Sequence, residues 1–93
     1  MLGWDLTVYR GATKVNKGYP SVEGGEVICY IEPTSNCGLI EPVEKAAIET
    51  VNTSGYPMVY RLRAGDFPHE QLKVPKLDIP DDEIVVVTMW DKS

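Results

Sequence analysis

His69 is the only histidine in the sequence, and two carboxylates, Asp66 and Glu70, lie close to it along the chain. A carboxylate can orient an imidazole. Cys37 precedes a predicted helix, a position that lowers the pKa of a thiol. Cys37 and His69 are therefore the candidate catalytic residues, as nucleophile and base. No known signature surrounds the cysteine, and nothing in the sequence brings residues 37 and 69 together. A loop cysteine and a surface histidine are the simpler interpretation, which favours a protein that is not an enzyme.

A second group of polar side chains places four carboxylates within six residues, and these are the candidate metal ligands. Carboxylate oxygens suit calcium or magnesium, but the spacing does not follow the EF-hand pattern and Pro80 interrupts it. An acidic loop that keeps the following apolar strand from pairing wrongly is the simpler interpretation. We therefore predict neither a metal nor a cofactor. The four residues are Asp78, Asp81, Asp82 and Glu83.

The chain also contains five tyrosines and two tryptophans. Such side chains are enriched at protein interfaces because they bury a large area and keep a hydrogen bond. Tyr19 and Tyr56 fall in predicted loops and are candidate contact residues. Trp4 and Trp90 fall in predicted strands, and we expect both in the core.

Four segments have the alternation or the β-branched composition of strands. Residues 4–10, 26–32 and 57–63 alternate, which is typical of strands on a sheet with one buried face. Residues 84–90, with the sequence IVVVTMW, are apolar on both faces. This pattern predicts an interior strand.

One helix is predicted, from Glu41 to Gly55. Pro42 suits the first helical position, and Gly55 can end the helix in a left-handed conformation. On a helical wheel, at about 100° per residue, Val43, Val51 and the side chains near them on the wheel form one apolar face. The segments 11–25 and 64–83 are predicted to be long loops, the first pinched into a small hairpin and the second holding one helical turn.

These elements predict a single domain, residues 1–93, of the α+β class. Its two layers are a four-stranded, mainly antiparallel sheet and one helix on one face, in the order β-β-α-β-β. The other face is then more apolar than a solvated face should be, so a second copy of the chain or the long loops should cover it. The binding residues predicted on this face are Tyr30, Val85, Val87 and Met89.

Charge and composition narrow the classes of partner. The formal net charge of -5 opposes nucleic-acid binding, which needs a basic surface to neutralise phosphates. No apolar run of about 18 residues is present, so we expect no membrane partner. With two cysteines and no hydrophobic leader, we expect a reduced, cytoplasmic protein.

Two segments, WDLTVYR at residues 4–10 and GYPMVYRLRAG at residues 55–65, resemble short uncharacterised bacterial proteins. Proteins of this type occur as open reading frames in mobile gene cassettes, such as those of integrons, and in phage-related regions. The resemblance implies a bacterial accessory protein and favours a partner-binding role. It assigns no catalytic or binding residue.

Three hypotheses for function follow. The first is a non-enzymatic protein-interaction module that pairs through the uncovered sheet face, as a homodimer or with another protein. The second is a small-molecule binder or small enzyme with a pocket under loops 11–25 and 64–83, using Tyr19, Cys37 and His69. The third is an acidic inhibitor that mimics nucleic acid through the carboxylates of residues 23–49 and 78–83.

Overall fold

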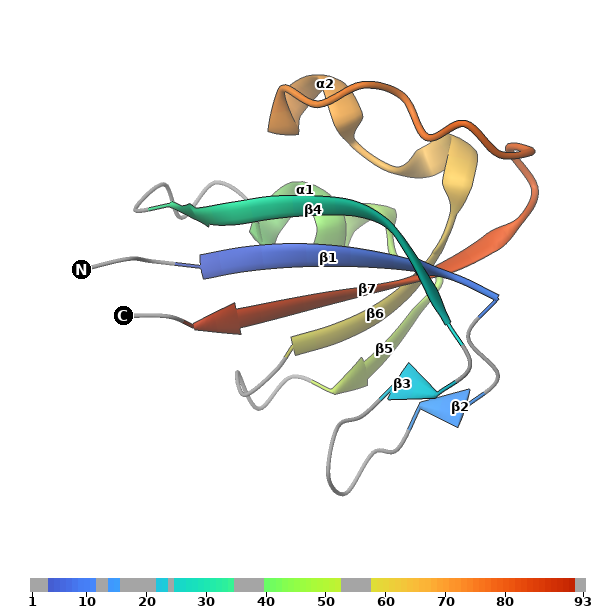
Figure 1. Ribbon diagram of the computed structural model, residues 1–93, viewed down its shortest axis with the longest axis horizontal. Coiled ribbons are helices and arrows are strands. Elements are labelled where there is room, and N and C mark those ends of the chain that lie inside the picture. The colour runs from blue at the N-terminus through green and yellow to red at the C-terminus, as the bar shows by residue number, and fades with distance from the viewer. Residues whose placement is uncertain are drawn as a thin grey trace.

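A five-stranded antiparallel sheet forms the centre of the protein in the computed structural model (Figure 1). The structure describes residues 4–11, 14–15, 22–23, 25–34, 40–52 and 58–91. The strand order is β4-β1-β7-β6-β5. The strands are β1 (Trp4–Arg10), β4 (Glu26–Thr34), β5 (Glu49–Asn52), β6 (Met58–Arg63) and β7 (Ile84–Asp91). The α+β class and the antiparallel sheet are as predicted, and β7 is an interior strand between β1 and β6.

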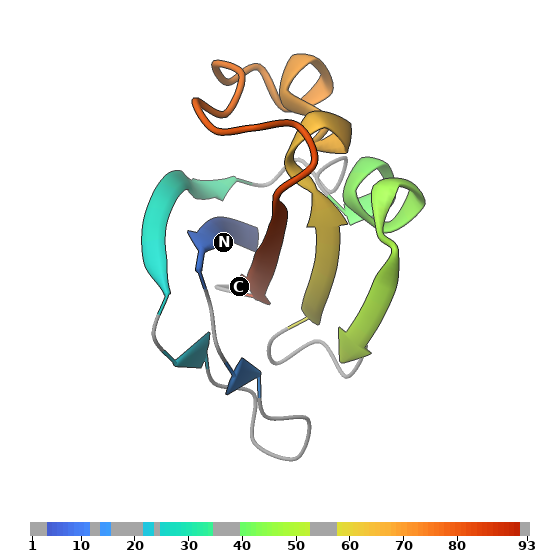
Figure 2. The same ribbon diagram turned by 90° about the vertical axis from the view of Figure 1, so that its right-hand side faces the viewer.

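Short elements lie on both sides of this sheet. Figure 2 shows the helices and residues 64–83 on one side and a small two-stranded ribbon on the other. The helical elements are α1 (Ile40–Ala46), the 3-10 turn η2 (Ala64–Asp66) and α2 (His69–Leu72). The ribbon pairs β2 (Lys14–Val15) with β3 (Val22–Glu23), so a hairpin forms within residues 11–25 as predicted.

The predicted helix over residues 41–55 is wrong in its second half. The helix α1 ends at Ala46, and residues 49–52 instead form β5, which makes the sheet five-stranded. Glu49 pairs with Arg61 of β6, and the Ile48 amide donates to the Arg61 carbonyl at 2.9 Å. The β-branched residues Ile48, Thr50 and Val51 are stiff at χ1 and favour a strand. Pairing with β6 therefore outweighs the helical periodicity.

The main core lies between the sheet and the helical elements that cover one of its faces. α1 contributes Val43, and the segment 64–83 contributes Phe67, Leu72 and Leu77. This segment therefore covers much of the face that one long helix was predicted to cover. From the sheet come Leu6 and Val8 of β1, Tyr60 and Leu62 of β6, and Val85, Val87 and Met89 of β7.

The predicted position of Val85, Val87 and Met89 on the uncovered face is wrong. All three are fully buried on the helical side. Val87 pairs with Val8 on one side and Tyr60 on the other, and paired residues share a face. Because β7 is apolar on both faces, its sequence cannot tell one face from the other, and a slip of one residue exchanges them.

The middle of the sheet face opposite the helices is buried. Val51, Val59 and Val86 form a second apolar cluster there, with Tyr9 packed against it. None of these three valines is more than 9% exposed, and the β2–β3 ribbon lies on this side of the sheet (Figure 2). The apolar middle of the face is therefore buried within the chain itself, and less of the face is open to a partner than the sequence predicted.

Backbone hydrogen bonds hold the acidic segment 78–83 against η2. The Ala64 amide donates to the Glu83 carbonyl at 2.8 Å, and the Gly65 amide donates to the Asp81 carbonyl at 2.9 Å. A Cβ atom built on Gly65 would lie 2.7 Å from the Asp81 Cβ and 3.2 Å from the Asp81 carbonyl oxygen. Glycine at position 65 thus allows the two segments to approach this closely.

We therefore expect Gly65→Ala to destabilise the protein by about 1–3 kcal/mol, because the added methyl group forces the two segments apart. The free energy of unfolding, measured in urea, checks this. Adding Asp81→Gly should recover part of the loss by removing the side chain that the methyl group meets. Strictly additive effects of the two changes would contradict the proposed clash.

Candidate functional site

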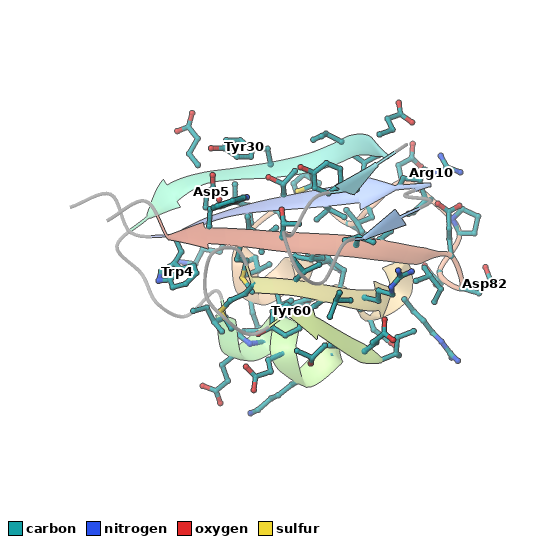
Figure 3. All side chains as sticks on the ribbon, turned by 90° about the horizontal axis from the view of Figure 1, so that it is seen from below. Trp4, Asp5, Arg10, Tyr30, Tyr60 and Asp82 are labelled. Atoms are coloured by element: carbon teal, nitrogen blue, oxygen red, sulfur yellow. The ribbon has the colours of Figure 1, made fainter. Side chains whose placement is uncertain are left out.

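Three strands bring Asp5, Tyr30 and Trp90 together at one end of the face opposite the helices. Asp5 of β1 pairs with Trp90 of β7, and Tyr30 of β4 pairs with Thr7, two residues after Asp5. Tyr30 and Trp90 thus stand on either side of Asp5. We call Asp5, Tyr30, Glu32 and Trp90 the aromatic end of the sheet. Figure 3 shows the side chains of Tyr30 and Asp5 directed toward each other.

Asp5 is the buried member of the aromatic end, with 5% of its surface exposed. Its Oδ2 accepts a hydrogen bond from the Tyr30 hydroxyl at 3.2 Å, and its Oδ1 accepts one from the Trp90 amide at 3.2 Å. A buried carboxylate is costly unless donors satisfy it. Asp5 therefore fixes both the tyrosine ring and the backbone of β7 at this point.

Tyr30 is the exposed member, with 52% of its surface open to solvent. Partial desolvation raises the pKa of its hydroxyl, and the charges of Asp5 and Glu32 and the hydrogen bond to Asp5 raise it further. The hydroxyl therefore stays protonated at neutral pH and remains a donor to Asp5. The result is an exposed aromatic ring held in one orientation.

Tyr30 lies on an edge strand. Within the described residues, β4 pairs with β1 alone, so one side of its backbone has no strand partner there. Val27 of the same strand is 55% exposed, and Trp90 is 39% exposed. The pairing with β1 shifts register between Val8 and Tyr9, which marks a bulge in β4. An edge with exposed apolar side chains is a template for pairing with another strand.

A cleft lies on the helical side of the sheet. Its volume is about 540 Å³, and it lies open between α1 and the η2–α2 segment. Phe67, Pro42 and Pro68 contribute apolar walls, and His69 is one of the polar residues that line it. The remaining lining residues are Lys45, Ala46, Gly65, Asp66, Glu70 and Gln71.

Comparison with family models, with curated proteins and with solved structures found no match. The argument for function therefore depends on the geometry of the sites. The resemblance of residues 4–10 and 55–65 to cassette-encoded and phage-related proteins stays a prediction. Among the described residues, no helix is long and apolar enough to span a membrane.

Of the predicted catalytic pair, the structure describes His69 alone. Cys37 lies outside the described residues. His69 begins α2, where it is half-buried, and its backbone amide donates to the Phe67 carbonyl at 2.7 Å. The other cysteine, Cys29, is a free thiol whose pKa is raised by burial. A raised pKa makes this thiol a weaker nucleophile at neutral pH.

The four predicted metal ligands do not converge. Glu83 binds Arg10 in a two-pronged ion pair, with contacts of 2.8 and 3.1 Å, and Asp81 lies 3.4 Å from the Lys76 ammonium. In the part of the chain that the structure describes, no three histidine, cysteine, aspartate or glutamate side chains form a metal-binding group. The Arg10–Glu83 pair instead joins the end of β1 to the start of β7. The other two residues, Asp78 and Asp82, are exposed.

Of the predicted binding residues, Tyr30 alone is exposed in the described structure. Tyr19 and Tyr56 lie outside the described residues, and the three β7 residues belong to the core. The sequence interpretation missed Asp5 and placed Trp90 in the core. Aspartate is depleted in strands, so its presence in the second position of WDLTVYR was a signal, but only the pairing of β1 with β7 links it to Trp90.

Proposed function

We propose that this protein is a non-enzymatic protein-interaction module that binds a partner along β4, with Tyr30 as the anchor. The observation that carries the proposal is the hydrogen bond from the exposed Tyr30 ring to the buried carboxylate of Asp5. Burying Asp5 costs free energy, and the arrangement holds in place an aromatic side chain that lies largely in solvent. Such an arrangement suits a binding surface better than a stabilising role.

Two physical arguments support β4 as the contact. A ring that is fixed before binding loses little conformational entropy when a partner covers it, and tyrosine is among the residues that dominate binding energy. An open strand edge adds main-chain hydrogen bonds to an incoming extended segment. In β4 the two features coincide, because Tyr30 and the exposed Val27 lie on the edge strand itself.

The hypothesis of a homodimer through the whole uncovered face is now restricted to a part of that face. The middle of that face is closed by its own chain, so the surface left for a partner is its β4 side and the aromatic end. A second copy of the chain is one candidate for that position, and light scattering over a range of concentrations would detect it.

Selection from a displayed peptide library, followed by affinity measurements on the isolated peptides, tests the proposal. We expect Tyr30→Ser to weaken binding about tenfold or more, as for a hot-spot residue. Ile48→Ser is the matched control, because Ile48 is similarly exposed, at 56%, but lies beside α1 on the far edge of the sheet. Equal binding by the Tyr30 variant and the intact protein would contradict the proposal.

The second candidate function is binding of a small molecule in the cleft between α1 and η2–α2. Its volume of about 540 Å³ is within the range of ligand sites. The cleft is open, however, and Lys45 on its wall is already paired with Glu41 at 3.1 Å. Ala46→Arg would obstruct this cleft and leave β4 unchanged. Loss of binding in that variant, with binding retained in Tyr30→Ser, would favour the cleft over β4.

The arrangement of carboxylates gives little support to nucleic-acid mimicry. Glu26 and Glu32 lie on β4, whereas Glu49 lies on β5 at the opposite edge of the sheet. Glu49 and Glu83 are also paired with arginines. A phosphate-like array would need these charges to line one surface, so we do not pursue this function.

A further inference from the structure

The edge strand β4 carries two carboxylates, Glu26 and Glu32. Glu26 and Glu32 are both exposed, and neither forms an ion pair within the described residues. Arg10 is the strand partner of Glu26, but its guanidinium makes both of its contacts with Glu83, from Nε at 2.8 Å and from Nη2 at 3.1 Å. The nearest cation along the strand pairing is therefore already engaged elsewhere.

These charges oppose pairing of β4 with a second copy of itself. A two-fold axis perpendicular to the sheet makes the two β4 edges antiparallel. Pairing over all of β4, Glu26–Thr34, is centred on Tyr30 and sets Glu26 opposite Thr34, whereas the neighbouring register is centred on Cys29. That register sets Glu26 against Glu32 of the other copy, twice. Like charges directly opposite each other destabilise a strand pair, and each copy has a net charge of -5. The edge is thus better suited to a partner of opposite charge.

The Tyr30 ring, on the same strand as the two carboxylates, adds a second feature that favours a cation, although Glu26 pairs with Arg10 and so lies on the other face of the sheet. Its ring is exposed, and the charge of Glu32 is close enough to raise the pKa of its hydroxyl. A tyrosine face attracts lysine and arginine side chains, and the attraction adds to that of a neighbouring carboxylate. The open strand edge favours an extended segment, and the tyrosine ring and the two carboxylates favour basic side chains. One partner, an extended basic segment, would satisfy all three features.

We infer that the partner is an extended, basic segment of another protein, which adds to the sheet as a further strand beside β4. Its lysine or arginine side chains lie near Glu26 and Glu32, and its apolar side chains contact Tyr30 and Val27. The inference rests on the proposed function, since it names the chemistry of the partner that β4 binds.

Fluorescence anisotropy with three labelled synthetic peptides tests the inference. Each peptide has a central run of valine, threonine and isoleucine, and the residues near its two ends are lysine, glutamine or glutamate. We expect the lysine peptide to bind about tenfold more tightly than the glutamine peptide, since two surface ion pairs are gained. The glutamate peptide should bind most weakly, and added salt should reduce the differences.

Two double variants separate a local charge effect from a general one. Glu26→Gln with Glu32→Gln should remove most of the preference for the lysine peptide. Glu70→Gln with Asp82→Asn removes the same number of charges from exposed positions away from β4 and should keep the preference. Methylating alternate backbone amides of the lysine peptide should weaken binding by at least about tenfold if the peptide pairs as a strand.

The outcomes distinguish this inference from the proposed function. Equal affinity for the lysine and glutamine peptides, with both lost in Tyr30→Ser, would overturn the basic partner and keep the interaction module. Loss of the preference in both double variants would also overturn it, because the effect would then come from net charge alone. A dimer that Tyr30→Ser dissociates would place a second copy on β4 instead. If Tyr30→Ser left the binding of all three peptides unchanged, both the basic partner and the proposed interaction through β4 would be overturned.

Discussion

Val87→Lys is expected to unfold the protein. Val87 is fully buried in the central strand, between Val8 of β1 and Tyr60 of β6. A lysine there must either bury its charge or lose its proton, and each costs several kcal/mol. The longer side chain adds about 1–3 kcal/mol of overpacking. Together these terms approach the total stability of about 5–14 kcal/mol expected for 93 residues.

Circular dichroism and urea unfolding of Val87→Lys check this expectation. The matched control is Val27→Lys, the same change at a position that is 55% exposed on β4, where an effect within about 0.5 kcal/mol is expected. If Val87 faced a second copy of the chain, its lysine variant would instead be a folded monomer. A folded Val87→Lys variant with a native unfolding midpoint would contradict the placement of Val87 in the core.

The strands were predictable because alternation reports directly on a sheet with two different faces. The predicted strand at residues 4–10 matches β1, and those at 26–32, 57–63 and 84–90 match β4, β6 and β7 within two residues at each end. The helix was overextended because Thr50 and Val51 fit a helical wheel as well as a strand. Their pairing with β6 depends on residues about ten positions away, which local periodicity does not include.

The candidate site was less predictable than the strands. Tyr30 was identified as a binding residue from its type and its face. Asp5 and Trp90 are 85 positions apart in the sequence, so their contact depends on β1 lying beside β7. For Val85, Val87 and Met89 the error was the opposite one, since these core residues were predicted to be contact residues. A strand that is apolar on both faces carries no signal of which face meets the helices. Strand pairing, rather than composition, separates the core from the candidate contact surface.

The second large effect is expected in alkaline solution and comes from Tyr60. This side chain is fully buried, and its hydroxyl donates to Glu44 Oε2 at 3.4 Å. Burial, and then the charge and hydrogen bond of Glu44, raise its pKa from the usual 10.0 to about 12. Between these two values the unfolded chain loses the phenol proton while the folded chain keeps it. Stability is therefore fully present below pH 10 and falls as the pH rises toward about 12.

The expected loss attributable to Tyr60 is about 1–3 kcal/mol, from a shift of about two pKa units. The measurement is the free energy of unfolding in urea at a series of alkaline pH values, together with the tyrosinate absorbance of the folded protein. Tyr60→Phe keeps the ring in the core and removes the titrating group, so its stability should fall less steeply over the same interval. Glu44→Gln should lower the pKa of Tyr60 only part of the way, because burial is the larger cause.

Glu44→Gln separates burial from charge as the cause of the raised Tyr60 pKa, and Tyr60→Phe shows whether this hydroxyl controls alkaline unfolding. A full return of the Tyr60 pKa to 10.0 in Glu44→Gln would mean that the carboxylate alone holds the proton. Parallel loss of stability in Tyr60→Phe and the intact protein would mean that another group controls alkaline unfolding. The expected pattern, a flatter curve for Tyr60→Phe and an intermediate one for Glu44→Gln, requires the hydroxyl to be enclosed between β6 and α1. It would therefore also test the position of the shortened helix against the sheet.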